Sequence, residues 1–384
     1  LKLSADLHTT SARRQVSPMS VQNGPELGAL LARINIADPQ TGRGLQLQAE
    51  PAAAGLDPAT PGLGALAGQL GVILRNNLAA PARALARAAD DTGHAGHAGH
   101  AGHAGHAGHA GHAGHAGHAG HAGHAGHAGH AGHAGEPAVW VCAALGERWP
   151  GDPSELDSHV LLNMSSPPSA AASRDGALER SPLLLHRREG DTLLRAIATA
   201  YPSPAAALHH YVELLVPPAL RLCTAHGVAL ELHLQNTLVV HRRGRLCGFI
   251  ARDLGGVRLH RGRLLAAGHH PALAAGSFVL TEDLGELQTK LAHALLHAHL
   301  GTVFGWAADH LGADEAALWG HTRAVLAAAL DAWAVAEPRL AAACIADRAA
   351  LLAPAVRAKA LLRMRIDERV SDYAYTDVAS PFGP

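Results

Sequence analysis

The sequence predicts a mixed α/β protein, in which a β-rich first segment precedes a domain with an antiparallel hairpin and a helical second half. Residues 1–50 alternate apolar and polar residues in short bursts between Gly and Pro, which is typical of strands. Residues 228–241 and 246–260 resemble two strands joined by the turn RRGR. Beyond about residue 280 the chain is rich in Ala and Leu, which favours helices.

Each expected element follows from a local pattern. Residues 191–226 predict two helices, because Pro-Ser-Pro provides a helix start between them and a glycine follows the second. One further helix is expected before the histidine-rich repeat. Its residues are PARALARAAD (81–90). The remaining expected elements are short apolar strands: LKLSADL (1–7), LLARINIAD (30–38), LQLQAE (45–50), LGVILRNN (70–77) and AVWVCAAL (138–145).

Composition excludes several classes of protein. The 384 residues are 48% hydrophobic and 16% charged, with a net charge of -1, so neither nucleic acid nor an anionic membrane is an expected partner. Charges and prolines interrupt every apolar run that approaches a membrane span. The four cysteines are far apart and form no CxxC pair, which favours a reducing cytoplasm over a disulfide framework or zinc ribbon.

A low-complexity tract divides the chain. The triplet GHA repeats fourteen times over residues 93–134, so fourteen of the thirty histidines lie there. Glycine at every third position resembles collagen, but no proline is present to preform the backbone. We expect a disordered linker over residues 93–135, produced by expansion of a short DNA repeat. The alternative is a functional site for zinc, nickel or copper, which dense imidazole binds.

Polar residues interrupt one of the expected strands. If residues 229–240 form a strand, Glu231, His233 and Gln235 share one face. A tight turn would then bring Asp253 close, so that His233 and Asp253 face one cavity from adjacent antiparallel strands. Carboxylate and amide oxygens suit Mg²⁺, which substrate phosphates often complete, and the imidazole suits a phosphate or a developing charge. The alternative is a polar cluster that braces the hairpin.

Six strings in order carry a resemblance to a known family. They are LKLSADLHTTSARR (1–14), SVQNGPELGALL (20–31), LGVILRNN, HGVALELHLQNTLVV (226–240), GFIARDLGGVRL (248–259) and KALLRMRI (359–366). Together they resemble the IucA/IucC family of siderophore synthetases, which work independently of non-ribosomal peptide synthetases. The resemblance runs from residue 1 nearly to the end, except for the GHA tract. It implies a fingers-like ATP-binding domain that ends near residue 50 and a palm-like domain over residues 51–384.

The resemblance also implies an activity and its partners. Members adenylate a carboxylate of citrate or a related acid with ATP, and an amine or hydroxyl then captures the acyl group. ATP and Mg²⁺ are therefore the implied cofactors. The implied substrates are a citrate-like carboxylate and an amine from a polyamine, an amino acid or a hydroxamate, and relatives suggest a homodimer.

Roles for individual residues follow from the same resemblance. Adenylation brings a carboxylate against a triphosphate, so cations must neutralise both, and arginine can hold oxygens in a bidentate way. The implied roles are catalysis by Arg14 and His233; ATP binding by Lys2, Arg14, His233, Gln235 and Asn236; substrate binding by Thr10, Arg14, His233 and Lys359; and Mg²⁺ binding by Glu231, Gln235 and Asp253.

Simpler interpretations stay open for several of these residues. A lone Lys2 or Arg14 is more often a solvated charge, and Lys359 is expected on a helix whose basic face could be solvated. Arg75 and Arg258 are further candidate anion contacts, without an assigned role. His293 and His297 are spaced like a zinc-binding pair, but no third ligand or HExxH motif accompanies them, so helix packing is the favoured interpretation.

The sequence departs from the family in one respect. The His-Pro-x-His-Pro motif and the Ser-x-Arg-Thr phosphate loop of the family's upstream half do not occur, so we expect a fragment without that half. Two other functions stay open. One is a metal-storage protein or metallochaperone that uses the GHA tract. The other is a FhuF-like ferric-siderophore reductase, against which the scattered cysteines argue, since such reductases use a closely spaced cysteine cluster.

We predict that the GHA tract is dispensable for folding. Its glycines and alanines offer little apolar surface to offset an ordering cost of roughly 1–2 kcal/mol per residue. Deletion of residues 93–134 should therefore leave the melting temperature nearly unchanged, as measured by circular dichroism. A fall of several degrees would show that the tract is part of the fold, and a loss of ATP-dependent activity would show that it is functional.

Overall fold

The structure is a computed structural model that describes residues 2–3, 16–57, 59–62, 66, 69–95, 138–142, 145, 192–367 and 374–383. It is a mixed α/β fold, as the sequence predicts, and the described part after residue 280 is mostly helical. None of the described helices is both long and apolar enough to cross a membrane.

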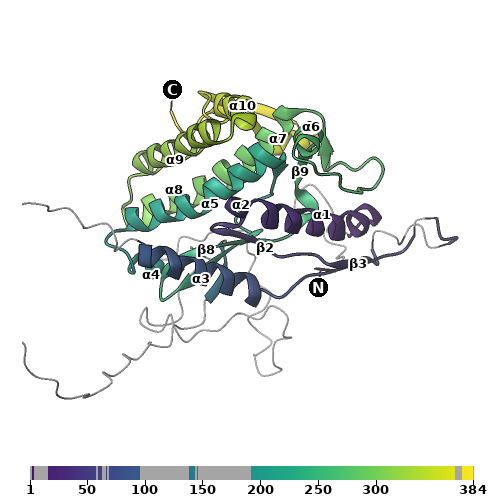
Figure 1. Ribbon diagram of the computed structural model, residues 1–384, viewed down its shortest axis with the longest axis horizontal. Helices are drawn as coiled ribbons and strands as arrows, with labels where there is room; N and C mark the ends of the chain where they lie inside the picture. Colours follow the sequence, from purple (N-terminus) through teal and green to yellow (C-terminus); the bar gives the residue numbers. More distant parts are fainter. Residues whose placement is uncertain are drawn as a thin grey trace, which may run out of the picture.

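Helices form most of the described chain (Figure 1). The α-helices are α1 (Pro18–Ala37), α2 (Pro39–Gly42), α3 (Ala79–Ala95), α4 (Leu193–Ala198), α5 (Pro204–His226), α6 (Arg261–Ala266), α7 (Leu284–Leu291), α8 (Thr302–Leu311), α9 (Glu315–Ala336), α10 (Ala341–Leu351) and α11 (Leu361–Ile366). Shorter turns and one π-helical segment connect some of them: the 3₁₀ turns η4 (Leu254–Gly256) and η6 (Pro338–Leu340), and the π-helix η5 (Ala292–Gly301).

The described strands form four sheets. The strands are β1 (Lys2–Leu3), β2 (Leu45–Leu47), β3 (Ala52–Ala54), β4 (Val72–Leu74), β5 (Ala138–Val141), β6 (Val228–Ala229), β7 (Thr237–Arg242), β8 (Arg245–Ala251), β9 (Arg258–His260), β10 (Leu280–Thr281), β11 (Ala355–Lys359) and β12 (Tyr375–Ala379). Their orders are β2-β8-β7-β5, β1-β4-β3, β10-β9-β6 and β11-β12. Pairing is antiparallel except for β2 with β8 and β10 with β9.

The β2-β8-β7-β5 sheet lies between helices. Alternate residues of β7 face opposite sides: Leu238 and Val240 pack with α3, whereas Val239 joins the larger core with Tyr211 of α5. In Figure 1, α3 lies on one side of β8, and α5, α8 and α9 lie on the other. The larger core thus fills the space between this sheet and the long helices.

Local signals set the predicted hairpin and the helix before it. Arg243 and Gly244, between β7 and β8, have φ of 50° and 75°, as a tight two-residue hairpin turn requires. Helix α5 begins after Ser203, whose side chain accepts a hydrogen bond from the Ala206 amide. It ends at Gly227, whose φ of 67° is left-handed. The predicted strands β2, β4 and β5 and the predicted helix α3 are also confirmed.

The strand expected over residues 30–38 is wrong, because this segment is the second half of α1. The helix begins where the Ser17 side chain accepts a hydrogen bond from the Ser20 amide, with Pro18 in its first turn. One face is fully apolar, and it consists of Leu27, Leu30, Leu31 and Ile34, each at most 1% exposed. That spacing of three and four residues is helical, and it outweighs the short alternation in INIAD.

A fully buried carboxylate joins four helices. Asp347 of α10 accepts two hydrogen bonds from Arg263, each 2.9 Å long, one from Thr224 and one from Gln288. Its side chain has no exposed surface. Because breaking a buried pair leaves an uncompensated charge, this cluster holds α5, α6, α7 and α10 in one arrangement.

His241 of β7 is a buried polar side chain. It has no exposed surface, and neither ring nitrogen has a hydrogen-bond partner among the described residues. Burial lowers the pKa of His241 from 6.5 to about 4. Between pH 6.5 and 4 the unfolded chain therefore binds a proton on this ring that the folded protein does not bind. The free energy of unfolding decreases as pH falls through this window.

We predict that His241→Leu stabilises the protein. The substitution removes an unpaired polar group and should raise the free energy of unfolding at pH 7 by on the order of 1 kcal/mol. It should also reduce the loss of stability between pH 7 and 4.5. Urea unfolding at both pH values measures this, with the solvent-exposed His270→Leu as the control. A His241→Leu protein that is less stable at pH 7, with an unchanged pH slope, would contradict the prediction.

Candidate functional site

Residues 230–236 form an irregular loop between β6 and β7, so the expected strand over this segment is wrong. The loop closes on itself at His233, whose carbonyl accepts hydrogen bonds from the Asn236 amide at 2.9 Å and the Thr237 hydroxyl at 3.1 Å. The strand begins only at Thr237. Strand alternation therefore does not place Glu231, His233 and Gln235, and their positions depend on contacts made by this loop.

The His233 ring has a defined tautomer. The Asn236 amide donates to His233 Nδ1 at 3.3 Å, so the proton of the neutral ring is on Nε2. Burial lowers the pKa of His233, although the nearby carboxylates of Glu231 and Asp253 oppose the shift. The neutral imidazole therefore presents an N–H donor, which suits an anionic oxygen.

Glu231 forms a partly buried ion pair near His233. Its Oε1 lies 2.6 Å from Lys290 Nζ of α7, a side chain that is only 5% exposed. Burial alone would raise the pKa of Glu231, but Lys290 outweighs it and the pKa is lowered. A Cβ at Gly256 would lie 1.7 Å from Glu231 Oε2. The second glycine of the Arg-Asp-x-Gly-Gly motif is thus required because the carboxylate occupies that space.

Asp253 follows β8 in a left-handed conformation, with φ 64° and ψ 75°. Such a conformation is uncommon for a residue with a side chain and often marks a functional position. The carboxylate lies 2.5 Å from Lys2 Nζ and 3.3 Å from an Arg75 nitrogen. Burial opposes ionisation of Asp253, but Lys2 and Arg75 lower its pKa overall.

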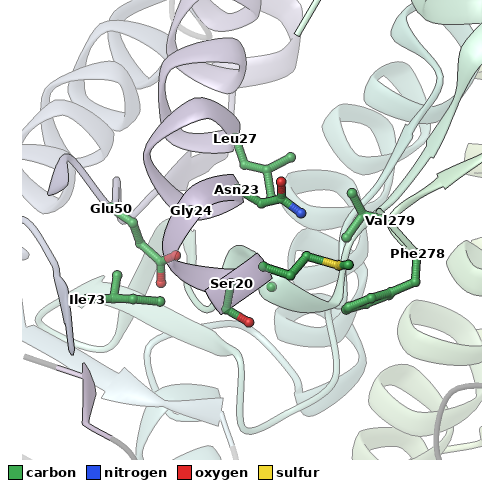
Figure 2. Close-up of a pocket in the computed structure, with 10 residues that line it drawn as sticks. Ser20, Asn23, Gly24, Leu27, Glu50, Ile73, Phe278 and Val279 are labelled. Atoms are coloured by element: carbon green, nitrogen blue, oxygen red, sulfur yellow. The ribbon is translucent and has the colours of Figure 1, made fainter. Parts of the chain in front are cut away.

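A second carboxylate shares Arg75. Glu50 Oε1 lies 3.0 Å from Arg75 Nε. Burial raises the pKa of Glu50, and Asp253 adds to the effect. Figure 2 shows Glu50 and Ile73 beside the helix turn that carries Ser20 and Gly24. The cavity there has a volume of about 10 Å³, which is room for about one water, so it is not a substrate site.

Lys359 lies in strand β11 and not on the expected helix, which starts only at Leu361. Five residues of β11 pair with β12, with Lys359 opposite Tyr375. Strand β11 packs against α7 and η5. Burial lowers the pKa of Lys359 to about 8, with Lys290 as a further cause, whereas Glu231 opposes the shift. Lys359 thus belongs to the same electrostatic environment as Lys290 and Glu231.

The structure brings together several of the predicted residues. The carboxylates of both Glu231 and Asp253 act on the pKa of His233, so the three side chains lie near one another. The prediction that His233 and Asp253 lie on adjacent antiparallel strands is wrong, because both lie outside β7 and β8. The Gln235 carbonyl accepts two hydrogen bonds from the Arg252 guanidinium, 3.0 and 2.8 Å long, and Asn236 is only 7% exposed. Thr10 and Arg14 lie outside the described residues.

The candidate metal ligands are engaged in ion pairs. Glu231 pairs with Lys290, and Asp253 pairs with Lys2. Within the described part of the chain, no three His, Cys, Asp or Glu side chains are grouped as a metal site. Their oxygens are the hard donors that Mg²⁺ prefers, so the assignment of Glu231, Gln235 and Asp253 to Mg²⁺ stays a prediction.

Sequence reasoning missed some charged residues of this site. Arg75 is a candidate anion contact in the sequence, but the sequence assigns it no role. Glu50 and Lys290 carried no distinguishing signal, since each is a single charge at the end of an expected strand or on an expected helix. Only their distances to Arg75 and Glu231 identify them.

Comparisons with known proteins agree with these motifs. A family model described as "IucA / IucC family" matches residues 1–91. The NRPS-independent siderophore synthetase rfs of Rhizopus delemar is 32% identical to this chain over 174 residues. The chain is thus similar to the IucA/IucC family over its first 91 residues. A second model, described as "Ferric iron reductase FhuF-like transporter", matches residues 208–374.

The match to rfs covers 44% of this chain and 25% of rfs. The fold is similar to that of the petrobactin biosynthesis protein AsbB from Bacillus anthracis, with a TM-score of 0.62 and 16% identity over 99% of this chain and 49% of AsbB. ATP-bound aerobactin synthetase IucA from Klebsiella pneumoniae gives a TM-score of 0.55 and 18% identity over 99% of this chain and 51% of IucA. The chain thus spans about half the length of these two structures.

A collagen triple-helix model matches residues 88–139. The GHA tract shares with collagen a glycine at every third position. It has no proline between residues 93 and 134, and proline is what preforms the collagen backbone.

We predict that Gly256→Ala disrupts the Glu231–Lys290 pair. The added methyl group would displace the Glu231 carboxylate and lower the free energy of unfolding by about 1–3 kcal/mol, the usual cost of overpacking. Urea unfolding measures this change. Gly305→Ala in α8 is the matched control, because its Cβ would meet no atom within 4 Å and alanine favours a helix. Equal stability of the two variants would contradict the steric role of Gly256.

Proposed function

We propose that this chain is the ATP-binding and substrate-binding C-terminal portion of a siderophore synthetase, which adenylates a carboxylate of citrate or a related acid and joins it to an amine or hydroxyl. The observation that carries the proposal is the neutral His233 ring, with its Nε2 donor in the neighbourhood of the Glu231–Lys290 and Asp253–Lys2 pairs. The ATP-bound state of the related fold in IucA supports ATP as the nucleotide.

The cations of the site favour a polyanion. Lys2, Arg75, Lys290 and Lys359 lie in one neighbourhood with the carboxylates of Glu50, Glu231 and Asp253. Burial raises the pKa of Glu50, which weakens its negative charge. A triphosphate and a carboxylate substrate would pair with these cations, and low local polarity strengthens such contacts.

Each proposed contact follows from the chemistry of its side chain. His233 would donate Nε2–H to a phosphate or to the oxygen that becomes charged during acyl transfer. Lys2 would bind phosphate, and Lys359 would bind a citrate carboxylate. Gln235 and Asn236 would complete the nucleotide contacts. Arg14 and Thr10 would hold the reacting carboxylate, and a bidentate arginine orients both oxygens.

Mg²⁺ fits the donor set of Glu231, Asp253 and Gln235, whose oxygens are hard ligands. Bound Mg²⁺ would neutralise phosphate charge during adenylation. The lysines that now pair with Glu231 and Asp253 would at the same time become available to phosphate oxygens. The ion pairs therefore hold both sets of charges in place before the nucleotide binds.

The pKa of Lys359 would respond to the substrate. With a pKa of about 8, a part of its population is neutral at physiological pH. A bound citrate carboxylate favours the charged form and would therefore raise this pKa.

The cellular setting of the proposal is a reducing compartment. All four cysteines are buried and free, as expected for a cytoplasmic protein. A homodimer is the assembly that we propose. The near-neutral net charge of -1 offers no footprint for nucleic acid or anionic lipid.

Two other functions receive less support. A FhuF-like ferric reductase is suggested by the family model over residues 208–374, but the four cysteines are buried at separate places, whereas an iron–sulfur centre needs several cysteines together. A metal-binding role for the GHA tract predicts stoichiometric metal binding that matters to function and no binding of nucleotide.

We predict that His233→Ala and Arg14→Ala each lower hydroxamate formation from citrate, ATP and hydroxylamine by about 10²- to 10³-fold, the loss typical of one charge-stabilising group. The assay uses the chain extended upstream to the length of its relatives. Arg14→Lys should also fail, because a point charge cannot bind in a bidentate way.

The control for this assay is His297→Ala, on η5. It should produce only a small packing effect. Full activity of the His233 and Arg14 variants, together with loss of activity in His297→Ala, would place the chemistry on the C-terminal helices and overturn the proposal.

A further inference from the structure

A buried hydrogen-bond chain reaches the loop that carries Glu231 and His233. His299 Nδ1 lies 2.8 Å from the Leu232 carbonyl oxygen, and its Nε2 lies 2.5 Å from the Tyr211 hydroxyl. The Cys142 thiol lies 3.4 Å from the same hydroxyl. Each of these four residues is at most 1% exposed.

The protons of this chain can be assigned. A carbonyl oxygen only accepts, so His299 Nδ1 must donate to Leu232. Burial lowers the pKa of His299 to about 4, and its ring is neutral, so Nε2 accepts from the Tyr211 hydroxyl. The Tyr211 hydroxyl is shared with the Cys142 sulfur, which accepts at 3.4 Å. Hydrogen bonds therefore join the two buried rings to each other and to the loop, and such a network makes the core more rigid.

We propose that His299 is a positioning residue for the site, and the proposal rests on the proposed function. Leu232 lies directly between Glu231 and His233, so its carbonyl fixes the peptide that joins the two. No sheet holds this segment, because the strand starts only at Thr237. Arg252 holds the other end of the loop through hydrogen bonds to the carbonyl oxygens of Gln235 and Asn236, so His299 supports the end that carries Glu231 and His233.

Three distant segments assemble this support. Tyr211 lies on α5, and its ring packs edge-on against Phe249 of β8 with centroids 4.5 Å apart. His299 lies in the π-helix η5, a conformation that is rare and found mostly at functional sites. Tyr211 therefore fixes His299, and His299 fixes the loop. Loss of His299 should leave the core in place while the loop loses its anchor.

The test compares four variants of the chain. His299→Leu removes both hydrogen bonds. His299→Asn keeps an amide N–H near the position of Nδ1 and should rescue the contact to Leu232. Tyr211→Phe keeps the ring and removes the hydroxyl. The matched control is His241→Leu, which also replaces a histidine with no exposed surface and a pKa of about 4, at the far end of β7.

Amide hydrogen exchange of the loop is measured without any need for activity. In His299→Leu we expect exchange of residues 230–236 to become about tenfold faster, as local opening becomes easier. His299→Asn should stay near the native rate, Tyr211→Phe should be intermediate, and His241→Leu should leave the rate unchanged.

Unchanged exchange of residues 230–236 in His299→Leu would overturn the inference, as would an equal change in His241→Leu. Turnover separates this result from the proposed function. In the protein extended to family length, His299→Leu should lower kcat by about 10²-fold with little change in KM for ATP, because small misplacement of a reacting group is costly. A loosened loop with normal turnover would confirm the support by His299 and reject the role of His233.

Discussion

The Glu231–Lys290 ion pair is the contact on which the candidate site depends. It joins the loop before β7 to helix α7 at 2.6 Å, and Gly256 of η4 leaves the space that the carboxylate occupies. A buried charge without a partner is strongly destabilising. The identities of residues 231, 256 and 290 are therefore coupled. The ion pair also positions His233, which lies two residues after Glu231.

His233 and Asp253 lie just beyond the ends of regular structure. The β7-β8 hairpin is a rigid base between α3 and α5, and His233 and Asp253 precede and follow its two strands. Outside the ladder the backbone can adopt a closed turn at His233 and a left-handed conformation at Asp253. A rigid scaffold with functional groups on its connecting segments is the common arrangement for binding sites.

Two kinds of charge cluster can be distinguished. The carboxylate of Asp347 accepts four hydrogen bonds and has no exposed surface, so it is a structural element that joins helices. Around Arg75, two carboxylates share one guanidinium, and the pKa of Glu50 is raised while that of Asp253 is lowered. Groups with opposing shifts in one neighbourhood are typical of functional sites, and here they lie beside His233.

Local signals in the sequence determined much of the fold. Pro-Ser-Pro and Gly227 set the ends of α5, RRGR set the hairpin, and the ordered motifs indicated the similarity to the IucA/IucC family that is found over residues 1–91. These features depend on residues close together in the chain. The apolar spacing of α1 was also present in the sequence, but the short alternation of INIAD obscured it.

Only the tertiary structure decided the geometry of the site. Alternate side chains share one face only where the backbone is extended, and residues 230–236 are not extended. Arg252, His299 and Lys290, from elsewhere in the chain, form the contacts that hold this segment. Lys359 lies in a strand because β12 pairs with β11. The residues around Lys359 have a composition typical of a helix, so the sequence alone did not predict this pairing. A single sequence shows which groups are present, but contacts between residues tens of positions apart determine which of them meet.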